Sequence, residues 1–175
     1  MSARRLSKAP VALLLVGLGL TGLSGCKDPD PVAVVATVNT PLPAYPAWAK
    51  PMIGQNMGHV LTGHGVCLGV WDVLTVKHIA KPTGSEAQGW GFDVAAKAPV
   101  QHILFVNADN IIIGAGEGGL PRADVAQART DVTSPKTGWH GLIGATEGKT
   151  LAVGVTSKNA GCSLGQYDLS ATSNS

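Results

Sequence analysis

The sequence predicts an all-β protein, and two observations carry the prediction. From residue 57 onward the apolar runs are short, rich in valine and isoleucine, and separated by glycine and asparagine, which is typical of strands rather than helices. Turn signals recur roughly every ten residues, the spacing expected of an all-β sandwich or barrel. We therefore expect an antiparallel β-sandwich of about six to eight strands with one short helix, preceded by a proline-rich linker.

Each strand is predicted from its own local pattern. Between residues 88 and 94 the residues alternate so that Trp90, Phe92 and Val94 share one face, as a half-buried strand requires. The segment Asn107–Asn110 supplies turn residues that tolerate a positive φ, so the apolar runs on either side of it should form a hairpin. In chain order, the expected strands are 66–76, 88–94, 100–106, 111–113, 139–143, 151–156 and 162–169.

The only helix that the sequence predicts is Ala123–Arg129. Pro121 shortly before it suits a first helical turn, where proline costs no hydrogen bond. We expect Arg122 and Asp124 to form a salt bridge that braces the loop before the strand at Trp139.

The N-terminus has the pattern of an export signal. Residues 1–8 are basic, and the apolar run that follows, Pro10–Leu20, is too short to cross a bilayer, which takes about 20 residues. The segment Leu23-Ser24-Gly25-Cys26 resembles the bacterial lipobox. That resemblance implies cleavage of a signal peptide over residues 1–25 and attachment of diacylglycerol and fatty acids such as palmitate to Cys26. An ordinary signal peptide with an unrelated cysteine is the alternative.

The lipobox resemblance also implies an address. Two or three acyl chains hold a protein on a membrane stably, whereas a single chain binds only marginally. An aspartate directly after the lipidated cysteine would resemble an inner-membrane retention signal, but Lys27 stands there. We therefore expect a lipid-anchored protein of the cell envelope, located at the outer membrane.

The remaining chain divides into three expected regions. Residues 26–56 are rich in proline among small residues and predict an extended linker that carries the lipidated cysteine. Within it, Tyr45–Trp48 could be a recognition element or an aromatic pair that packs back on the domain. Residues 57–169 should form the β-sandwich domain, and residues 170–175 a flexible tail.

Charge excludes one class of partner. The chain has 13 Lys and Arg against 11 Asp and Glu, and removal of the signal segment takes away Arg4, Arg5 and Lys8. The mature protein is therefore near neutral, and no basic tract with interleaved aromatics remains. We expect no nucleic-acid partner.

Two cysteines remain after Cys26 is assigned to lipid. In an oxidising compartment we expect Cys67 and Cys162 to form a disulfide, with two separate buried thiols as the alternative. The absence of a Cys-x-x-Cys motif argues against a redox or metal role for these cysteines.

Three segments of the second half resemble a bacterial immunoglobulin-like module. They are Gly89-Trp90-Gly91-Phe92-Asp93, then Leu120-Pro-Arg122-Ala-Asp124-Val125-Ala126 after a hairpin, and then Thr137-Gly138-Trp139. The resemblance implies an immunoglobulin-like β-sandwich at the cell surface. Such modules are accessory or of unknown role, so the resemblance carries over no catalytic residues.

The residue patterns that suggest chemistry are weak. The segment Gly114–Gly119 fits the dinucleotide-binding pattern, but Pro121 follows at once and no parallel βαβ unit surrounds it, so we expect a glycine-rich loop and no nucleotide. His59 and His64 lack an identifiable third ligand, so we expect exposed loop histidines and no metal. His102 shares a strand face with Leu104, which favours a partly buried imidazole.

No activated nucleophile is identifiable either, because the chain lacks a Gly-x-Ser-x-Gly motif and its cysteines are expected to be lipidated or oxidised. We therefore expect no enzyme and no cofactor.

Two functional hypotheses remain. The first is a non-catalytic envelope lipoprotein whose domain is an interaction or structural module for a protein partner. The alternative is a carbohydrate-binding module that recognises a cell-surface or cell-wall glycan through an exposed Trp139, with help from His140 or Asp93, because indole rings stack on sugar rings. For Trp139 the sandwich fold favours the other interpretation, a buried core tryptophan, because such folds normally bury a tryptophan beside the disulfide.

Overall fold

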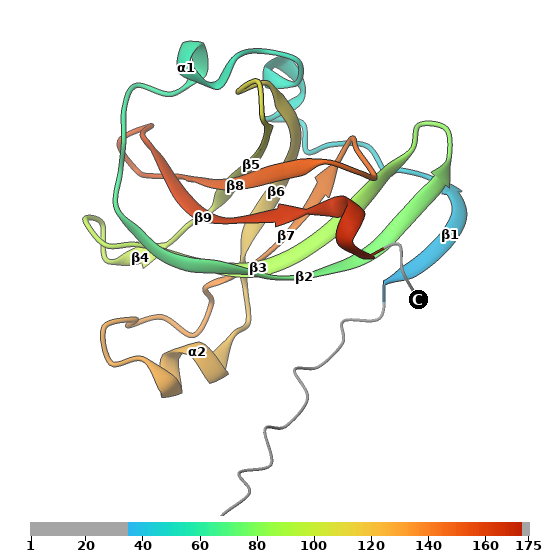
Figure 1. Cartoon of the computed structure of the whole chain (residues 1–175). Helices are drawn as coiled ribbons and strands as arrows, with labels where there is room; N and C mark the ends of the chain where they lie inside the picture. Colours follow the sequence, from blue (N-terminus) through green and yellow to red (C-terminus); the bar gives the residue numbers. More distant parts are fainter. Residues whose placement is uncertain (1–34, 173–175) are drawn as a thin grey trace, which may run out of the picture. The chain divides into compact units, whose positions relative to one another are not determined.

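The computed structural model describes residues 35–172, so the predicted signal peptide and the lipidation site Cys26 lie outside the described residues. Figure 1 shows the arrangement. The strands are β1 (Ala36–Pro41), β2 (Cys67–Ala80), β3 (Gly84–Asp93), β4 (Ala98–Pro99), β5 (His102–Asn107), β6 (Ile112–Leu120), β7 (Gly138–Ile143), β8 (Lys149–Val155) and β9 (Gly161–Asp168). The short helices are η1 (Lys50–Met52), α1 (Met57–Val60), α2 (Ala123–Ala128) and η2 (Leu169–Thr172).

The prediction of an all-β fold with few helices is confirmed. The strands hydrogen bond in one nine-stranded sheet of order β1-β2-β3-β7-β6-β5-β8-β9, with β4 beside β3. The two separate sheets of an immunoglobulin-like sandwich are not confirmed, because this hydrogen-bonded order is continuous. The expected antiparallel pairing holds for every pair except β1 with β2, which is parallel.

The sheet curls until strands from its two ends meet. In Figure 1, β9 crosses close to β2 although the two strands lie far apart in the sheet order. A Cβ atom built on Gly69 of β2 would lie 2.5 Å from Leu164 of β9, so glycine permits this approach. The disulfide Cys67–Cys162 joins the two strands at the same place, which confirms the predicted pair.

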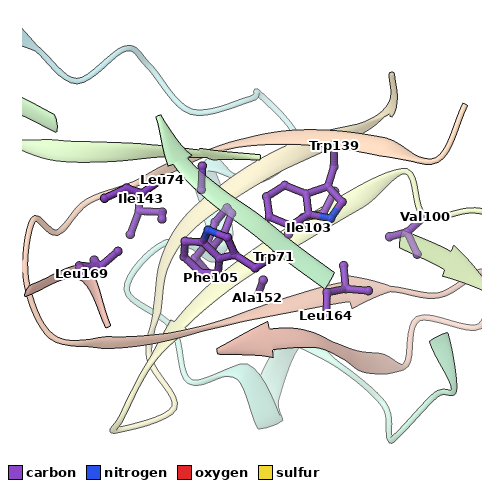
Figure 2. Packing of buried hydrophobic residues seen from close by; sticks show 11 residues of the cluster. Trp71, Leu74, Val100, Ile103, Phe105, Trp139, Ile143, Ala152, Leu164 and Leu169 are labelled. Atoms are coloured by element: carbon purple, nitrogen blue, oxygen red, sulfur yellow. The ribbon is translucent and has the colours of Figure 1, made fainter. Parts of the chain in front are cut away.

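Aromatic side chains fill the interior of the curled sheet. Trp71, Phe105 and Trp139 meet edge to face with ring centroids 5.2, 5.9 and 6.2 Å apart, a favoured geometry for aromatic pairs. Figure 2 shows these rings surrounded by aliphatic side chains from several strands. Glycines face the rings: a Cβ on Gly89 would lie 2.3 Å from Trp139, and one on Gly141 would lie 2.2 Å from Phe105.

The predicted linker is part of the folded domain from residue 36 onward, so the boundary expected at residue 56 is wrong. Strand β1 pairs with β2, and Leu42 and Ala49 are buried. Apolar side chains between Trp48 and Leu61 pack on the outer surface of β5, β6 and β8. Proline disfavours central strands but is compatible with an edge strand and with a covering loop, which is how the domain uses this segment.

A second outer cluster lies under the segment that carries α2. Val125 and Val132 cover Trp90 and Phe92, and the side chain of Arg129 lies over the Trp90 ring at 5.7 Å. The helix confirms the expected position within one residue. The expected brace is also present, since Arg122 contacts both Asp124 and Asp72.

Two further expectations were wrong. The segment Gly114–Gly119 is not a loop but part of β6, because its glycines let β6 approach β7 closely: a Cβ on Gly116 would lie 2.4 Å from the carbonyl oxygen of His140. Residues 170–172, which were expected in a flexible tail, belong to η2 instead. Within the described residues, no helix is long and apolar enough to cross a membrane.

Candidate functional site

A row of polar side chains crosses the outer surface of the sheet. The strand registers pair His102 of β5 with Glu117 of β6, Glu117 with His140 of β7, and His140 with Gln88 of β3. Because side chains alternate along a strand, His140 points outward next to the inward Trp139. Four consecutive strands therefore place His102, Glu117, His140 and Gln88 side by side on one face.

Glu86 extends this row toward the sheet edge. Its two carboxylate oxygens lie 2.8 Å from Nε2 of His78 and 2.8 Å from Nε2 of His140. An ionised carboxylate only accepts hydrogen bonds, so both imidazoles donate from Nε2. Nδ1 of His78 lies 3.1 Å from the hydroxyl and 3.3 Å from the carbonyl oxygen of Thr40 in β1. The cluster therefore links four strands.

The electrostatics of Glu86 follow from this geometry. Burial disfavours the charged carboxylate, but the hydrogen bonds from His78 and then His140 outweigh it, and the pKa of Glu86 lies below its ordinary value. Glu86 is therefore ionised at neutral pH. It accepts a hydrogen bond from Nε2 of His140, and within residues 35–172 the other ring nitrogen of His140 has no hydrogen-bond partner.

A hollow of about 330 Å³ lies beside His140, between the row and the chain that crosses it. Glu117 and His140 supply its polar lining, and the rest is aliphatic or small: Ala44, Pro46, Ala115, Gly116, Leu120 and Leu142. The volume is at the lower end of the roughly 300–1,000 Å³ range of small-molecule sites. The hollow therefore suits one small polar group with an apolar stem.

The segment 44–48, which crosses the polar row, is held in place by its aromatic residues. Tyr45 donates its hydroxyl hydrogen bond to the carbonyl oxygen of Ile113 at 3.1 Å, and burial raises the pKa of Tyr45. Trp48 stacks on His102 with ring centroids 4.2 Å apart. Of the two interpretations of Tyr45–Trp48, packing back on the domain is the one observed.

The three predicted glycan-binding residues do not form one surface. Trp139 is 1% exposed inside the curled sheet, so its indole has no open face for a sugar, and the interpretation as a core tryptophan is the one observed. Asp93 is 3% exposed. Only His140 reaches the candidate site.

Asp93 has a structural role instead. Its carboxylate accepts hydrogen bonds from the backbone NH groups of Ala95, Ala96 and Ser157 and from the Ser157 hydroxyl, at 3.0–3.1 Å. Burial disfavours its charge, but these bonds outweigh burial and the pKa of Asp93 lies below its ordinary value. The side chain thereby ties the loop after β3 to the turn between β8 and β9.

His59 and His64 are not part of the polar row, whereas His102 is at its end. His59 and His64 are exposed, as expected, although His59 lies in α1 and not in a loop. His102 is exposed rather than partly buried, and Trp48 stacks on its ring. Within residues 35–172, no group of three or more His, Cys, Asp or Glu side chains is placed to hold a metal ion.

A second hollow of about 230 Å³ lies between α1 and strands β8 and β9. Met57, Leu61, Leu151 and Val153 line it, and His64 lies at its polar side. It presents apolar surface with little to orient a ligand.

Sequence reasoning did not assign Glu86 or Glu117, the two carboxylates of the row, to a binding site. The alternation that identified Trp90 continues backward through Gln88 to Glu86, so a longer predicted strand would have included it. Glu117 lies in the glycine-rich segment Gly114–Gly119, which was expected to be a loop rather than a strand. Comparisons of the chain with protein-family models, curated proteins and solved structures found no significant match.

Proposed function

We propose that this chain is a non-catalytic lipoprotein of the cell envelope, anchored at the outer membrane through Cys26, whose β domain binds a protein partner. The N-terminal pattern supports the anchor, and the outer face of β5, β6 and β7 supports the binding surface. The observation that carries the proposal is the hollow beside His140, where the side chains of Glu117 and Leu120 are exposed and Glu117 forms no ion pair within the described residues.

The distribution of charged side chains supports this choice of face. Asp93 accepts four hydrogen bonds, and Arg122 forms ion pairs with two carboxylates. These groups stabilise the domain itself. Glu117 is not used in this way, and it stands beside an apolar side chain, Leu120, that is 44% exposed. We assign these two side chains and the hollow beside them to contact with the partner protein.

The glycan-binding alternative now depends on different residues. A mixed lining of carboxylate, imidazole and aliphatic groups is compatible with a small sugar, and this observation keeps the alternative in view. Trp139 cannot stack on a sugar ring, as this alternative required, because its side chain is buried. For that reason the protein partner is the function we place first.

The proposal is tested by site-specific photo-crosslinking in bacterial cells that produce the full chain. The substitution Leu120→benzoyl-phenylalanine places the reactive group at the hollow, and Ile79→benzoyl-phenylalanine places it at another exposed apolar position, on β2. We expect one discrete envelope protein to be cross-linked from position 120 and not from position 79. The Glu117→Gln variant should weaken that cross-link.

Two results would overturn the proposal. The first is the absence of any protein adduct specific to position 120, and the second is a glycan adduct at that position. The anchor is checked in the same cells: Cys26→Ser should move the protein from the membrane fraction to the soluble fraction. Retention of this variant in the membrane fraction would contradict the lipid anchor.

A further inference from the structure

The carboxylate of Glu117 has no cationic partner in the described part of the chain. Its side chain is exposed at the hollow, and no ion pair or hydrogen bond is made by its carboxylate there. The nearest arginine along the chain, Arg122, is held away by Asp72 and Asp124. The hollow therefore contains an acidic group whose charge the domain leaves uncompensated.

The titratable groups around the hollow add to this negative charge. Glu117 and His140 line it, Glu86 lies directly behind His140, His78 lies on the far side of Glu86, and His102 neighbours Glu117 in the strand register. Glu86 is thus a second carboxylate near Glu117, and the other three members of the group are imidazoles. No lysine or arginine lines the hollow.

The remaining lining suits an aliphatic chain. Pro46 and Leu142 are apolar parts of the hollow, and Leu120 stands at the same site, half-exposed. Lysine and arginine side chains bury their methylene stems against apolar surface while the charged head meets a polar group. A ligand with a cationic end and an apolar stem satisfies both parts of this lining.

We infer that the hollow between β6, β7 and the crossing segment 44–46 receives a lysine or arginine side chain of the protein partner, with its cationic head at Glu117. This inference rests on the proposed function and specifies the partner's chemistry. Glu117 supplies the ion pair, and the free ring nitrogen of His140 supplies a second polar contact. The aliphatic lining holds the methylene stem.

The test uses the full chain in detergent micelles and N-acetyl-arginine amide as the probe, whose only charge is the guanidinium. Backbone-amide NMR should show saturable shifts at residues 115–117 and 140–142. Glu117→Gln should weaken binding about threefold or more, because an exposed ion pair and a charge-assisted hydrogen bond are lost. Glu147→Gln removes an equally exposed carboxylate from the turn before β8 and should leave binding unchanged.

N-acetyl-citrulline amide has nearly the same shape without the charge, and it should give no shifts at these residues. The inference is overturned if the citrulline probe binds as well as the arginine probe, if Glu117→Gln has no effect, or if N-acetylglucosamine alone shifts these residues. Failure of the arginine probe while the cross-link at position 120 persists would overturn this inference and leave the proposed function intact. Loss of that cross-link would overturn both.

Discussion

Some positions in this protein require glycine, because a larger side chain would collide with a neighbouring ring or strand. The interior holds three large rings, and the strands opposite them carry glycines at the points of closest approach. A Cβ on Gly89 would lie 2.3 Å from Trp139 and 2.2 Å from the carbonyl oxygen of Val70. A flexible side chain could move away from such a contact, but the backbone of the neighbouring strand cannot.

The first prediction follows from that contact. Gly89→Ala should lower the free energy of unfolding by about 1–3 kcal/mol, the usual cost of overpacking a core. Urea denaturation followed by tryptophan fluorescence measures the change. Gly63→Ala is the matched control, because a Cβ on Gly63 meets nothing within 4 Å, and it should be nearly neutral. Equal stability of the two variants would contradict the packing argument.

At the scale of elements, one carboxylate links several strands through hydrogen bonds. Glu86 of β3 accepts from His78 of β2 and from His140 of β7, and His78 in turn contacts Thr40 of β1. Because the folded state holds the pKa of Glu86 below its ordinary value, ionised Glu86 stabilises the fold. This contribution is present above the unfolded-state pKa and is lost as the pH falls through the folded-state pKa.

The second prediction is therefore pH-dependent. At pH 7, Glu86→Gln should lower the free energy of unfolding by about 1–2 kcal/mol, since hydrogen bonds to a charged group are lost. At a pH below the folded-state pKa the variant and the native chain should be nearly equally stable. Denaturation curves at both pH values test this, with Glu147→Gln as the control. A loss of the same size at low pH would show that the charge is not responsible.

The elements also show what local sequence could and could not predict. Strands β5, β7, β8 and β9 were predicted close to their observed bounds, because alternation and turn residues are local signals. The strand character of Gly114–Gly119 was missed because it depends on the close approach of β7. The role of residues 36–56 was missed for the same reason: proline density predicts an extended chain but not the surface that it covers. Of the candidate site, only His140 was predicted.

At the scale of the whole molecule, the disulfide closes the curled sheet. The sequence predicted that Cys67 and Cys162 pair, but not that the bond would join strands from distant parts of one sheet, because strand order depends on long-range pairing. The bond spans 95 residues. In the unfolded chain it closes a loop that includes most, but not all, of the described residues.

The third prediction concerns this bond. The double variant Cys67→Ser with Cys162→Ser should lower the free energy of unfolding by about 2–5 kcal/mol, mainly because the unfolded chain regains entropy. Thermal unfolding of the full chain measures the effect, and reduction of the native protein by dithiothreitol should reproduce it. Native-like stability of both the variant and the reduced protein would contradict a stabilising bond.

The parallel strand β1 has a mechanical consequence for a protein held by its N-terminus. With the proposed anchor at Cys26, tension would enter the described fold at Ala36 and run along β1. The ladder hydrogen bonds that pair β1 with β2 over Ala36–Val38 lie across that direction, so a pull along the strand loads them together instead of one after another. Side-by-side loading resists force far better than sequential opening, so β1 is a clamp at the point where a tethered domain would be pulled.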